Sequence, residues 1–169
     1  MVISLANIDT STATALSPAL AEKYQRLQSL LAAMGRVLVA YSGGVDSTLV
    51  VRVAHDVLGD DMLAVLAISE SYSAAEQPGA IALLEAIGAP YRLVHTQEVH
   101  DPRYAANPAN RCYFCKTHLY GELYELAEAG RFDVIVDGSN VDDKGDHRPG
   151  RQAGREHGVR SPLQEAGYT

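Results

Sequence analysis

The residues best suited to chemistry in this sequence form one short segment of glycines and hydroxyl side chains. Residues 42–48, Ser-Gly-Gly-Val-Asp-Ser-Thr, follow an apolar run and precede a stretch of helical periodicity, which predicts a strand, a turn and a helix start. Glycines leave room for a ligand, and exposed N–H groups at a helix start attract an anion. The alternative is an ordinary strand-to-helix turn without a ligand. We predict that this turn binds the phosphates of a nucleotide through Ser42, Gly43, Gly44, Asp46, Ser47 and Thr48.

Carboxylates that would lie near these phosphates form a second candidate group. Asp46 belongs to the turn itself, whereas Asp137 and Asp142 follow a later predicted strand. A bare carboxylate repels a polyphosphate, so such residues usually act through Mg²⁺. We predict Asp46, Asp137 and Asp142 as ligands of Mg²⁺ or of its water shell. A solvated acidic loop with Asp137 as a turn former is the alternative.

Two cysteines three residues apart, Cys112 and Cys115, form a third group. On a helix they would share a face, and the neighbouring Arg111 and Lys116 would favour thiolates. A zinc site with His118, a redox disulfide, an iron–sulfur cluster and plain core packing all stay open. Two thiolates by themselves complete neither a zinc site nor a cluster, so a metal centre here would need a further ligand.

Two further segments are candidates for ligand contacts. Ala67 and Ser69 leave a predicted strand, where free backbone groups could read the edge of an adenine. Arg148, Arg151 and Arg155 are spaced i, i+3 and i+7, which would place forked donors for phosphate or carboxylate on one helical face. An ordinary strand exit and a solvated basic face are the respective alternatives.

The elements that must position these groups alternate along the chain. Ser17 and Pro18 predict the start of a first helix, which ends near Gly35. Predicted strands cover residues 36–41, 63–68, 91–95 and 133–136, with a possible fifth at 160–163; predicted helices cover residues 47–58, 74–87 and 107–129, with no clear closing helix. Ser73 and Glu76 would form a capping box. Continuously apolar strands separated by helices indicate an α/β fold: a parallel sheet with helices on both faces and the ligand site at the carboxyl ends of its strands.

The composition bounds the class of protein. The chain has 169 residues, 47% of them hydrophobic, which suits one domain with a proper core, preceded by a loose tail over residues 1–16. A net charge of −7 argues against a general nucleic-acid binder. The sequence contains no apolar stretch as long as a membrane span, and its first residues lack the basic region of a signal peptide. We therefore expect a cytoplasmic protein with no nucleic-acid or membrane partner.

The turn resembles the S-G-G-x-D-S signature of the PP-loop ATP pyrophosphatases, which have an adenine nucleotide alpha-hydrolase-like fold. Further stretches narrow the resemblance to the LarE family: Arg111-Cys112-Tyr113-Phe114-Cys115-Lys116, Asp137-Gly138-Ser139-Asn140, Asp146-His147-Arg148-Pro149-Gly150 and Arg160-Ser161-Pro162-Leu163. The resemblance runs from about residue 36 to the end of the chain. It implies that residues 17–169 form the PP-loop domain of that family, without its C-terminal domain.

This resemblance implies an ATP-dependent sulfur transferase of nickel-pincer cofactor biosynthesis. Members adenylylate a carboxylate of pyridinium-3,5-dicarboxylate mononucleotide and convert it to a thiocarboxylate. ATP and Mg²⁺ at the turn, a small nucleotide substrate and a homo-oligomer are the corresponding expectations. A [4Fe-4S] cluster on the two cysteines would need a third cysteine, which this chain lacks. The residues expected to act are Cys112, Cys115 and Asp46 in catalysis, and Gly138, Arg148 and Arg151 in nucleotide binding.

Three other functions remain as alternatives within the same signature. An amide-forming PP-loop ligase, such as an NAD or GMP synthetase, would not need the cysteine pair. A tRNA thiolase shares the cysteines but should carry a more basic surface than a net charge of −7 allows. A nucleotide-binding module without catalysis would bind ATP but release neither AMP nor pyrophosphate.

Overall fold

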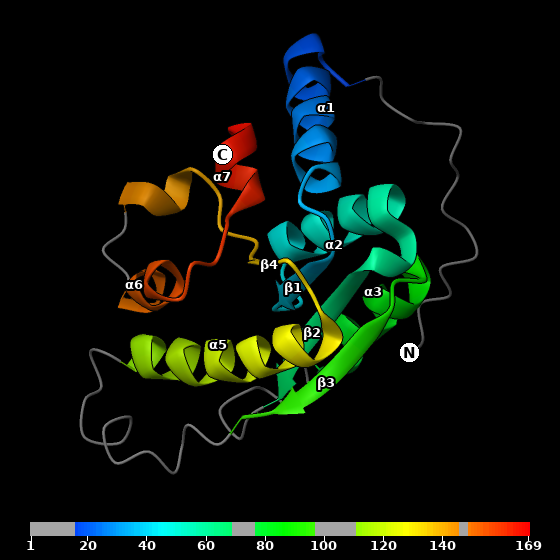
Figure 1. The fold of residues 1–169 in the computed structure, drawn as a ribbon. Coiled ribbons are helices and arrows are strands. Elements are labelled where there is room, and N and C mark those ends of the chain that lie inside the picture. The colour runs from blue at the N-terminus through cyan, green and yellow to red at the C-terminus, as the bar shows by residue number, and fades with distance from the viewer. Residues whose placement is uncertain (1–15, 69–76, 97–110, 146–148) are drawn as a thin grey trace.

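A four-stranded parallel sheet forms the centre of the computed structural model, which describes residues 16–68, 77–96, 111–145 and 149–169 (Figure 1). The strands are β1 (Val37–Tyr41), β2 (Met62–Ile68), β3 (Tyr91–His95) and β4 (Val134–Val136), in the order β3-β2-β1-β4. Val39 of β1 pairs with Ala64 of β2 on one side and with Val136 of β4 on the other. The predicted α/β class with a parallel sheet is confirmed.

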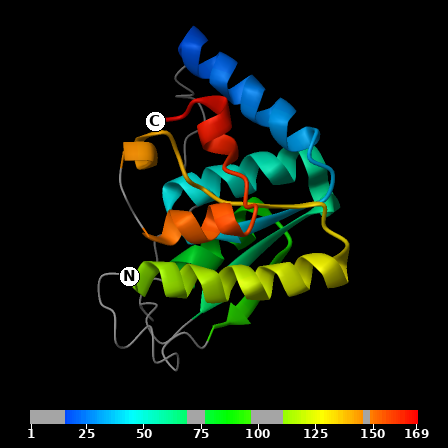
Figure 2. The same cartoon turned by 60° about the vertical axis from the view of Figure 1, so that its left-hand side comes forward.

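Helices cover both faces of this sheet (Figures 1 and 2). The elements are α1 (Pro18–Ala32), α2 (Val45–Leu58), α3 (Gln77–Ile87), α5 (Arg111–Gly130), α6 (Pro149–Glu156) and α7 (Pro162–Ala166), with the 3₁₀ turns η3 (Gly59–Asp61) and η6 (Asp142–Gly145). One core cluster joins α1, α2, α3 and α7 to the sheet, and a second joins α5 and α6 to its other face. Because successive residues of a strand point to opposite faces, Val39 packs in the first cluster and Leu38 in the second.

Local signals explain where the helices begin and end. The side chain of Ser17 accepts a hydrogen bond from the Leu20 N–H at 3.3 Å, and Pro18 occupies the first helical position of α1. Gly59 ends α2 with a φ of 57°, a conformation that costs glycine little. The four predicted strands 36–41, 63–68, 91–95 and 133–136 agree with these elements to within one residue, and the predicted helix 47–58 agrees with α2 to within two. Helix α1 ends at Ala32, three residues before its predicted end near Gly35.

The predicted fifth strand at residues 160–163 is wrong, and the chain does have a closing helix. Arg160 makes one parallel bridge beside Val136: its N–H donates to the Ile135 carbonyl at 3.0 Å, and its carbonyl accepts from the Asp137 N–H at 2.9 Å. Pro162 has no N–H to continue such a ladder but suits the first position of a helix, so α7 begins there. Helix α7 then packs beside α1 (Figures 1 and 2).

Three predictions fall outside the described residues. They are the loose tail, of which only residue 16 is described, the capping box of Ser73 and Glu76, and the helix start at Asn107-Pro108. The described part of that last helix, α5, runs to Gly130 as predicted.

Candidate functional site

The turn between β1 and α2 has the backbone of an anion site. Gly43 takes a left-handed φ of 82°, which turns the chain sharply between strand and helix. Gly44 is the N-cap of α2, with a φ of −74° and a ψ of 161°. The N–H groups of the first turn of a helix have no partner within the helix, so those that follow Gly44 are available to an anion.

Hydroxyl groups hold this turn in shape. The buried Ser47 hydroxyl donates to the Gly44 carbonyl at 3.0 Å, accepts from the Ser42 N–H at 3.3 Å and lies 3.1 Å from the Ser42 hydroxyl. Thr48 donates to the same Gly44 carbonyl at 2.8 Å. Ser47 and Thr48 are therefore bonded within the turn, and the backbone N–H groups are its main donors toward a ligand.

Two glycines of the site differ in the room that the fold leaves for a side chain. A Cβ built on Gly44 would meet only the Ser42 Oγ at 3.5 Å, an ordinary contact. A Cβ built on Gly138, just after β4, would lie 2.6 Å from the Ser47 nitrogen and 2.8 Å from its Cα. Gly138 thus lets the loop after β4 close onto the start of α2, whereas at Gly44 the fold itself has room for a side chain.

A cavity of about 500 Å³ opens over the turn, and we call it the loop cavity. The ends of β1 and β4, the start of α2 and one face of α5 enclose it. Its lining residues are Ala40, Tyr41, Ser42, Gly44, Val45, Asp46, Ser47, Lys116, Leu119, Tyr120, Asp137, Gly138, Ser139 and Asp143. The carboxyl ends of two parallel strands thus meet at one cavity, as the topology predicts.

Asp46 reaches across this cavity to the loop after β4. Its Oδ2 accepts a hydrogen bond from the Asn140 amide at 3.1 Å, and both side chains are half-buried. Asn140 is fixed in turn by Asp143, whose carboxylate accepts from the Asn140 N–H at 3.0 Å. The acidic residue of the phosphate turn is therefore oriented by an amide 94 residues further along the chain.

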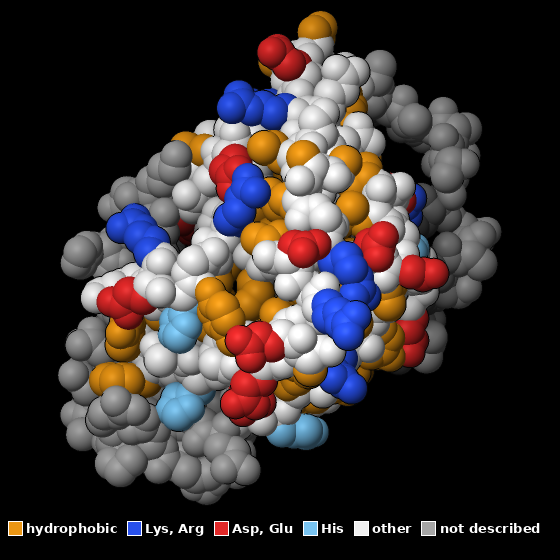
Figure 3. Space-filling model, in the orientation of Figure 1, with side chains coloured by type: hydrophobic (Ala, Val, Ile, Leu, Met, Phe, Trp, Pro, Cys, Tyr) orange, Lys and Arg blue, Asp and Glu red, His pale blue; other side chains and the backbone are white. Residues whose placement is uncertain are grey.

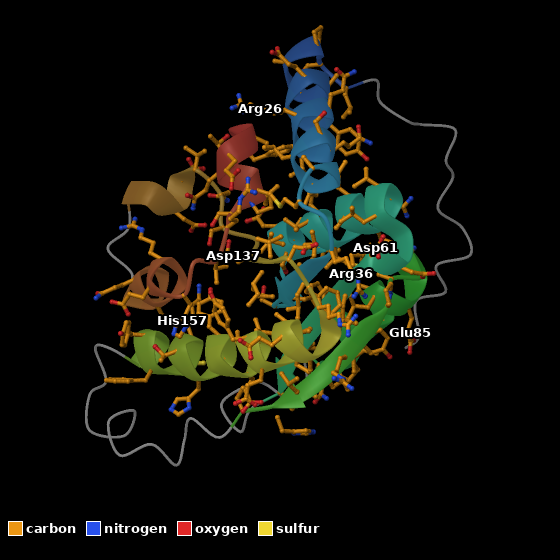
Figure 4. The ribbon with its side chains drawn as sticks, viewed as in Figure 1. Arg26, Arg36, Asp61, Glu85, Asp137 and His157 are labelled. Carbon is orange, nitrogen blue, oxygen red and sulfur yellow. The ribbon has the colours of Figure 1, made fainter. Side chains whose placement is uncertain are left out.

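Asp137 is bound by hydroxyl and N–H donors. Its carboxylate accepts from the Ser139 N–H at 3.1 Å, the Ser139 hydroxyl at 2.8 Å and the Ser161 hydroxyl at 2.8 Å. Figure 4 shows it near α6 and α7, away from Arg36 and Asp61, which precede β1 and β2. Asp142 is exposed, and Asp143 lines the loop cavity instead. No three His, Cys, Asp or Glu side chains converge on a metal-sized site within the described residues.

Helix α5 contributes two residues that sequence reasoning missed as site residues. Lys116 and Tyr120 lie one turn apart and both line the loop cavity. Lys116 has no hydrogen bond or ion pair with any residue in the described ranges, so its charge is available to a ligand. Burial raises the pKa of Tyr120, and the negative charge of Asp137 raises it further. The i, i+4 spacing on a predicted helix was the available signal, but nothing in the sequence told which face would meet the turn.

The cysteines lie at the start of α5, as the predicted helix requires. Cys115 is half-buried, immediately before Lys116, and the side chain of Cys112 lies outside the described part. His118, the zinc candidate, lines a separate hollow with Phe114. Cys115 thus directly precedes a residue that lines the loop cavity, Lys116, but is not itself among the residues that line it.

A second cavity of about 510 Å³ adjoins the first. Asp137 and Ser139 line both cavities, and α6 and α7 enclose the rest. Arg155 and Arg160 bring positive charge to it, although Arg160 is bound to Glu165 at 3.1 Å. The hydrogen bond to Glu165 raises the pKa of the Arg160 guanidinium.

The remaining predicted contacts are described only in part. Arg148 and Ser69 lie outside the described residues, and of Arg151 only its place in α6 is described. Ala67 lies in β2, paired with Val94, and is not among the described residues that line the loop cavity. No helix in the described ranges combines the length and the apolar character needed to cross a membrane.

The sequence profile of NAD synthase matches residues 21–108 of this chain. An uncharacterized protein of Synechocystis sp. is 48% identical over 146 residues, covering 86% of this chain and 54% of that protein. The pyridinium-3,5-bisthiocarboxylic acid mononucleotide synthase of Lactiplantibacillus plantarum is 38% identical over 150 residues, covering 88% of this chain and 54% of that protein. The chain thus spans about half the length of these curated relatives.

Solved structures of low sequence identity share the fold. An NH3-dependent NAD synthetase from Campylobacter jejuni superposes with a TM-score of 0.65 at 16% identity, covering 79% of this chain and 62% of that one. The U34-tRNA thiolase NcsA from Methanococcus maripaludis, solved with its [4Fe-4S] cluster, gives a TM-score of 0.62 at 18% identity, covering 86% of this chain and 59% of that one.

Proposed function

Because this chain belongs to the NAD synthase family of PP-loop domains, we propose that it binds ATP in the loop cavity and transfers AMP to a carboxylate. The observation that carries this proposal is the open space at Gly44. The fold would accept a side chain there, yet the position faces the cavity next to the donors of α2. Glycine at such a position leaves the backbone accessible to a phosphate.

The charges around the loop cavity suit a reaction that releases pyrophosphate. The start of α2 offers N–H donors and the positive end of a helix dipole. Lys116 adds a full positive charge without an ion-pair partner in the described ranges. A cation fixed in place stabilises the negative charge that develops on a departing pyrophosphate.

Mg²⁺ fits the acidic side of the cavity. Asp46 and Asp137 supply carboxylate oxygens, the donors that this ion prefers, and phosphate oxygens and water would complete its six ligands. The ion would neutralise the repulsion between these carboxylates and the polyphosphate. Asp46 is held in place by Asn140 before any ligand arrives.

The second cavity is where we place the carboxylate substrate. A carboxylate that attacks the α-phosphate must approach from a space adjoining the loop cavity, and the second cavity shares two lining residues with it. Arg155 offers a forked donor for an anionic group there. The relative from L. plantarum is named for a pyridinium-3,5-bisthiocarboxylic acid mononucleotide, so we propose the corresponding pyridinium dicarboxylate mononucleotide as the substrate.

The proposed reaction has two balanced steps. A carboxylate oxygen bonds to the α-phosphorus while the bond from that phosphorus to the oxygen bridging to the β-phosphate breaks, which releases pyrophosphate. A sulfur nucleophile then bonds to the activated carbonyl carbon, AMP leaves with the former carboxylate oxygen, and a thiocarboxylate remains. The first step is needed because a carboxylate is a poor electrophile until it carries a leaving group.

The cysteines are the proposed route for sulfur. Thiolates of Cys112 and Cys115 suit iron, and the neighbouring Lys116 favours the ionised form. A [4Fe-4S] cluster would supply a bound sulfide for the second step. The chain contains two cysteines in all, so the third thiolate of such a cluster would come from outside this sequence.

An oxygen-isotope experiment tests the proposed function. The protein is incubated with Mg²⁺, ATP, a sulfide source and pyridinium-3,5-dicarboxylate mononucleotide labelled with ¹⁸O in its carboxylates. We expect pyrophosphate and ¹⁸O-labelled AMP, in amounts that depend on the substrate. Formation of ADP and phosphate, or of AMP without label, would contradict acyl transfer through an adenylate.

The same assay separates the alternatives. An amide-forming ligase would release AMP with deamido-NAD and ammonia but not with the pyridinium substrate. A tRNA thiolase would require tRNA, to which a chain of net charge −7 has little general attraction. Figure 3 shows that basic side chains on the face in view lie beside acidic ones. A binding module would release no pyrophosphate under any of these conditions.

A further inference from the structure

Tyr120 of α5 is a nearly buried side chain that nonetheless lines the loop cavity. It is only 1% exposed and packs with Leu123 and Ala153 in the core between α5 and α6. Its hydroxyl makes no hydrogen bond to any residue in the described ranges. Its oxygen is not itself fully buried, since among the described residues His55 Nδ1 is the buried side-chain atom left without a partner, so the Tyr120 hydroxyl is reached from the cavity that the residue lines. The hydroxyl can therefore donate to a molecule bound in that cavity.

The hydroxyl of Tyr120 lies at the boundary of the two cavities. Tyr120 itself lines the loop cavity, and Gly154 of α6 lines the second cavity. A Cβ built on Gly154 would lie 3.4 Å from the Tyr120 Oη, so the phenol tip lies against the wall of the second cavity. The phosphate turn and the phenol thus face the same space from α2 and α5.

The Tyr120 phenol is a hydrogen-bond donor at physiological pH. A tyrosine is neutral at physiological pH in any case, and burial and the nearby Asp137 raise the pKa of Tyr120 above its ordinary value. A neutral phenol donates to an anionic oxygen without adding charge to the cavity. Lys116, one turn earlier on the same helix, supplies the charge.

We propose that Tyr120 is a substrate-contacting residue whose hydroxyl donates a hydrogen bond to the α-phosphate of the bound nucleotide, at the point where the carboxylate arrives from the second cavity. This assignment rests on the proposed function. The β- and γ-phosphates lie on the start of α2, and the phenol contacts the phosphorus that is transferred. Such a bond strengthens as charge gathers on the α-phosphate oxygens during transfer.

The test is Tyr120→Phe, with binding of ATP, AMP and inorganic pyrophosphate measured by calorimetry. The affinities for AMP and ATP should fall about tenfold, the loss of one hydrogen bond to a charged group. The affinity for pyrophosphate, which has no α-phosphate ester, should not change. The melting temperature should change little, because the hydroxyl bonds to no other described residue and the aromatic ring stays in the core cluster.

Tyr124→Phe is the matched control. The Tyr124 hydroxyl donates to the His157 carbonyl, and Tyr124 does not line the loop cavity within the described residues. This variant should lower the melting temperature and leave all three affinities unchanged. AMP bound equally well by Tyr120→Phe and the wild type would overturn the assignment while leaving the proposed function intact. A wild-type protein that bound no adenine nucleotide would overturn both.

Discussion

At the scale of single residues, Gly44 offers the sharpest test of the phosphate turn. Gly44→Ala should weaken ATP binding by tenfold or more, because a methyl group would occupy the backbone approach of a phosphate. The folded state accepts the change: φ is −74° and the new Cβ would meet only the Ser42 Oγ at 3.5 Å. The free energy of unfolding should therefore change by less than about 1 kcal/mol. Calorimetry and a denaturant titration measure the two effects.

Gly121→Ala is the control for this substitution. Gly121 is exposed in the middle of α5, and nothing lies within 4 Å of a Cβ built there. The control should bind ATP normally and gain roughly 0.5–1 kcal/mol of stability, since alanine favours a helix interior more than glycine does. Unchanged ATP affinity in a folded Gly44→Ala protein would rule out phosphate binding at this turn.

A substitution at Asp46 tests whether Mg²⁺ takes part in ATP binding. Asp46→Asn removes the charge but keeps an oxygen that can accept the hydrogen bond from Asn140, now 3.1 Å long. ATP affinity should therefore fall mainly when Mg²⁺ is present, because the carboxylate acts through the cation. The measurement is ATP affinity in Mg²⁺ and in EDTA for both proteins. An equal loss in the two buffers would indicate a role in shaping the start of α2 instead.

At the scale of elements, the loop after β4 depends on a close approach to α2. Gly138→Ala should destabilise the protein by about 1–3 kcal/mol, the usual cost of overpacking, because the new Cβ would lie 2.6 Å from the Ser47 nitrogen. Chemical denaturation measures this loss of stability. Gly79→Ala on α3, with open space around a built Cβ, is the control. A midpoint for Gly138→Ala equal to that of the wild type would mean that the loop moves away without cost.

The start of α5 should bind a soft metal through its cysteines. When a third cysteine is supplied, by a longer chain or by a second copy, anaerobic reconstitution with iron and sulfide should give the broad thiolate-to-iron absorption, lost in both Cys112→Ala and Cys115→Ala, whereas the 169-residue chain by itself should hold iron weakly. His118→Ala should keep it, because imidazole is a ligand in the zinc interpretation only. Tight binding of one zinc that His118→Ala abolishes would instead favour a structural zinc site.

At the scale of the whole molecule, two adjoining cavities predict two separable binding events. Arg155→Glu should reduce the affinity for the pyridinium mononucleotide at least tenfold by reversing a charge in the second cavity. ATP affinity should change little, because Arg155 is not among the described residues that line the loop cavity. Competition binding with each ligand measures this, and loss of both affinities together would contradict the two-cavity arrangement.

The sequence was sufficient where local chemistry decides the outcome. The apolar run 37–41 and the glycines after it predict a buried strand, a turn and a helix start, since strand burial and left-handed glycines are local requirements. The alternation of strands and helices along the chain was predicted from its apolar periodicity. Within the described residues the segment 160–163 was misread as a possible strand, because Pro162 suits the first position of a helix and cannot donate to a ladder.

Tertiary structure alone decided which distant residues complete the site. The pairing of Asp46 with Asn140, the contact of Gly138 with Ser47, and the turn of α5 that brings Tyr120 to the cavity all depend on how α5 and β4 pack on the sheet. Helical spacing fixes which residues share a face, but the rotation of that face toward the phosphate turn is set by packing of the second core cluster. Those contacts span tens of residues of sequence, and local patterns carry no information about them.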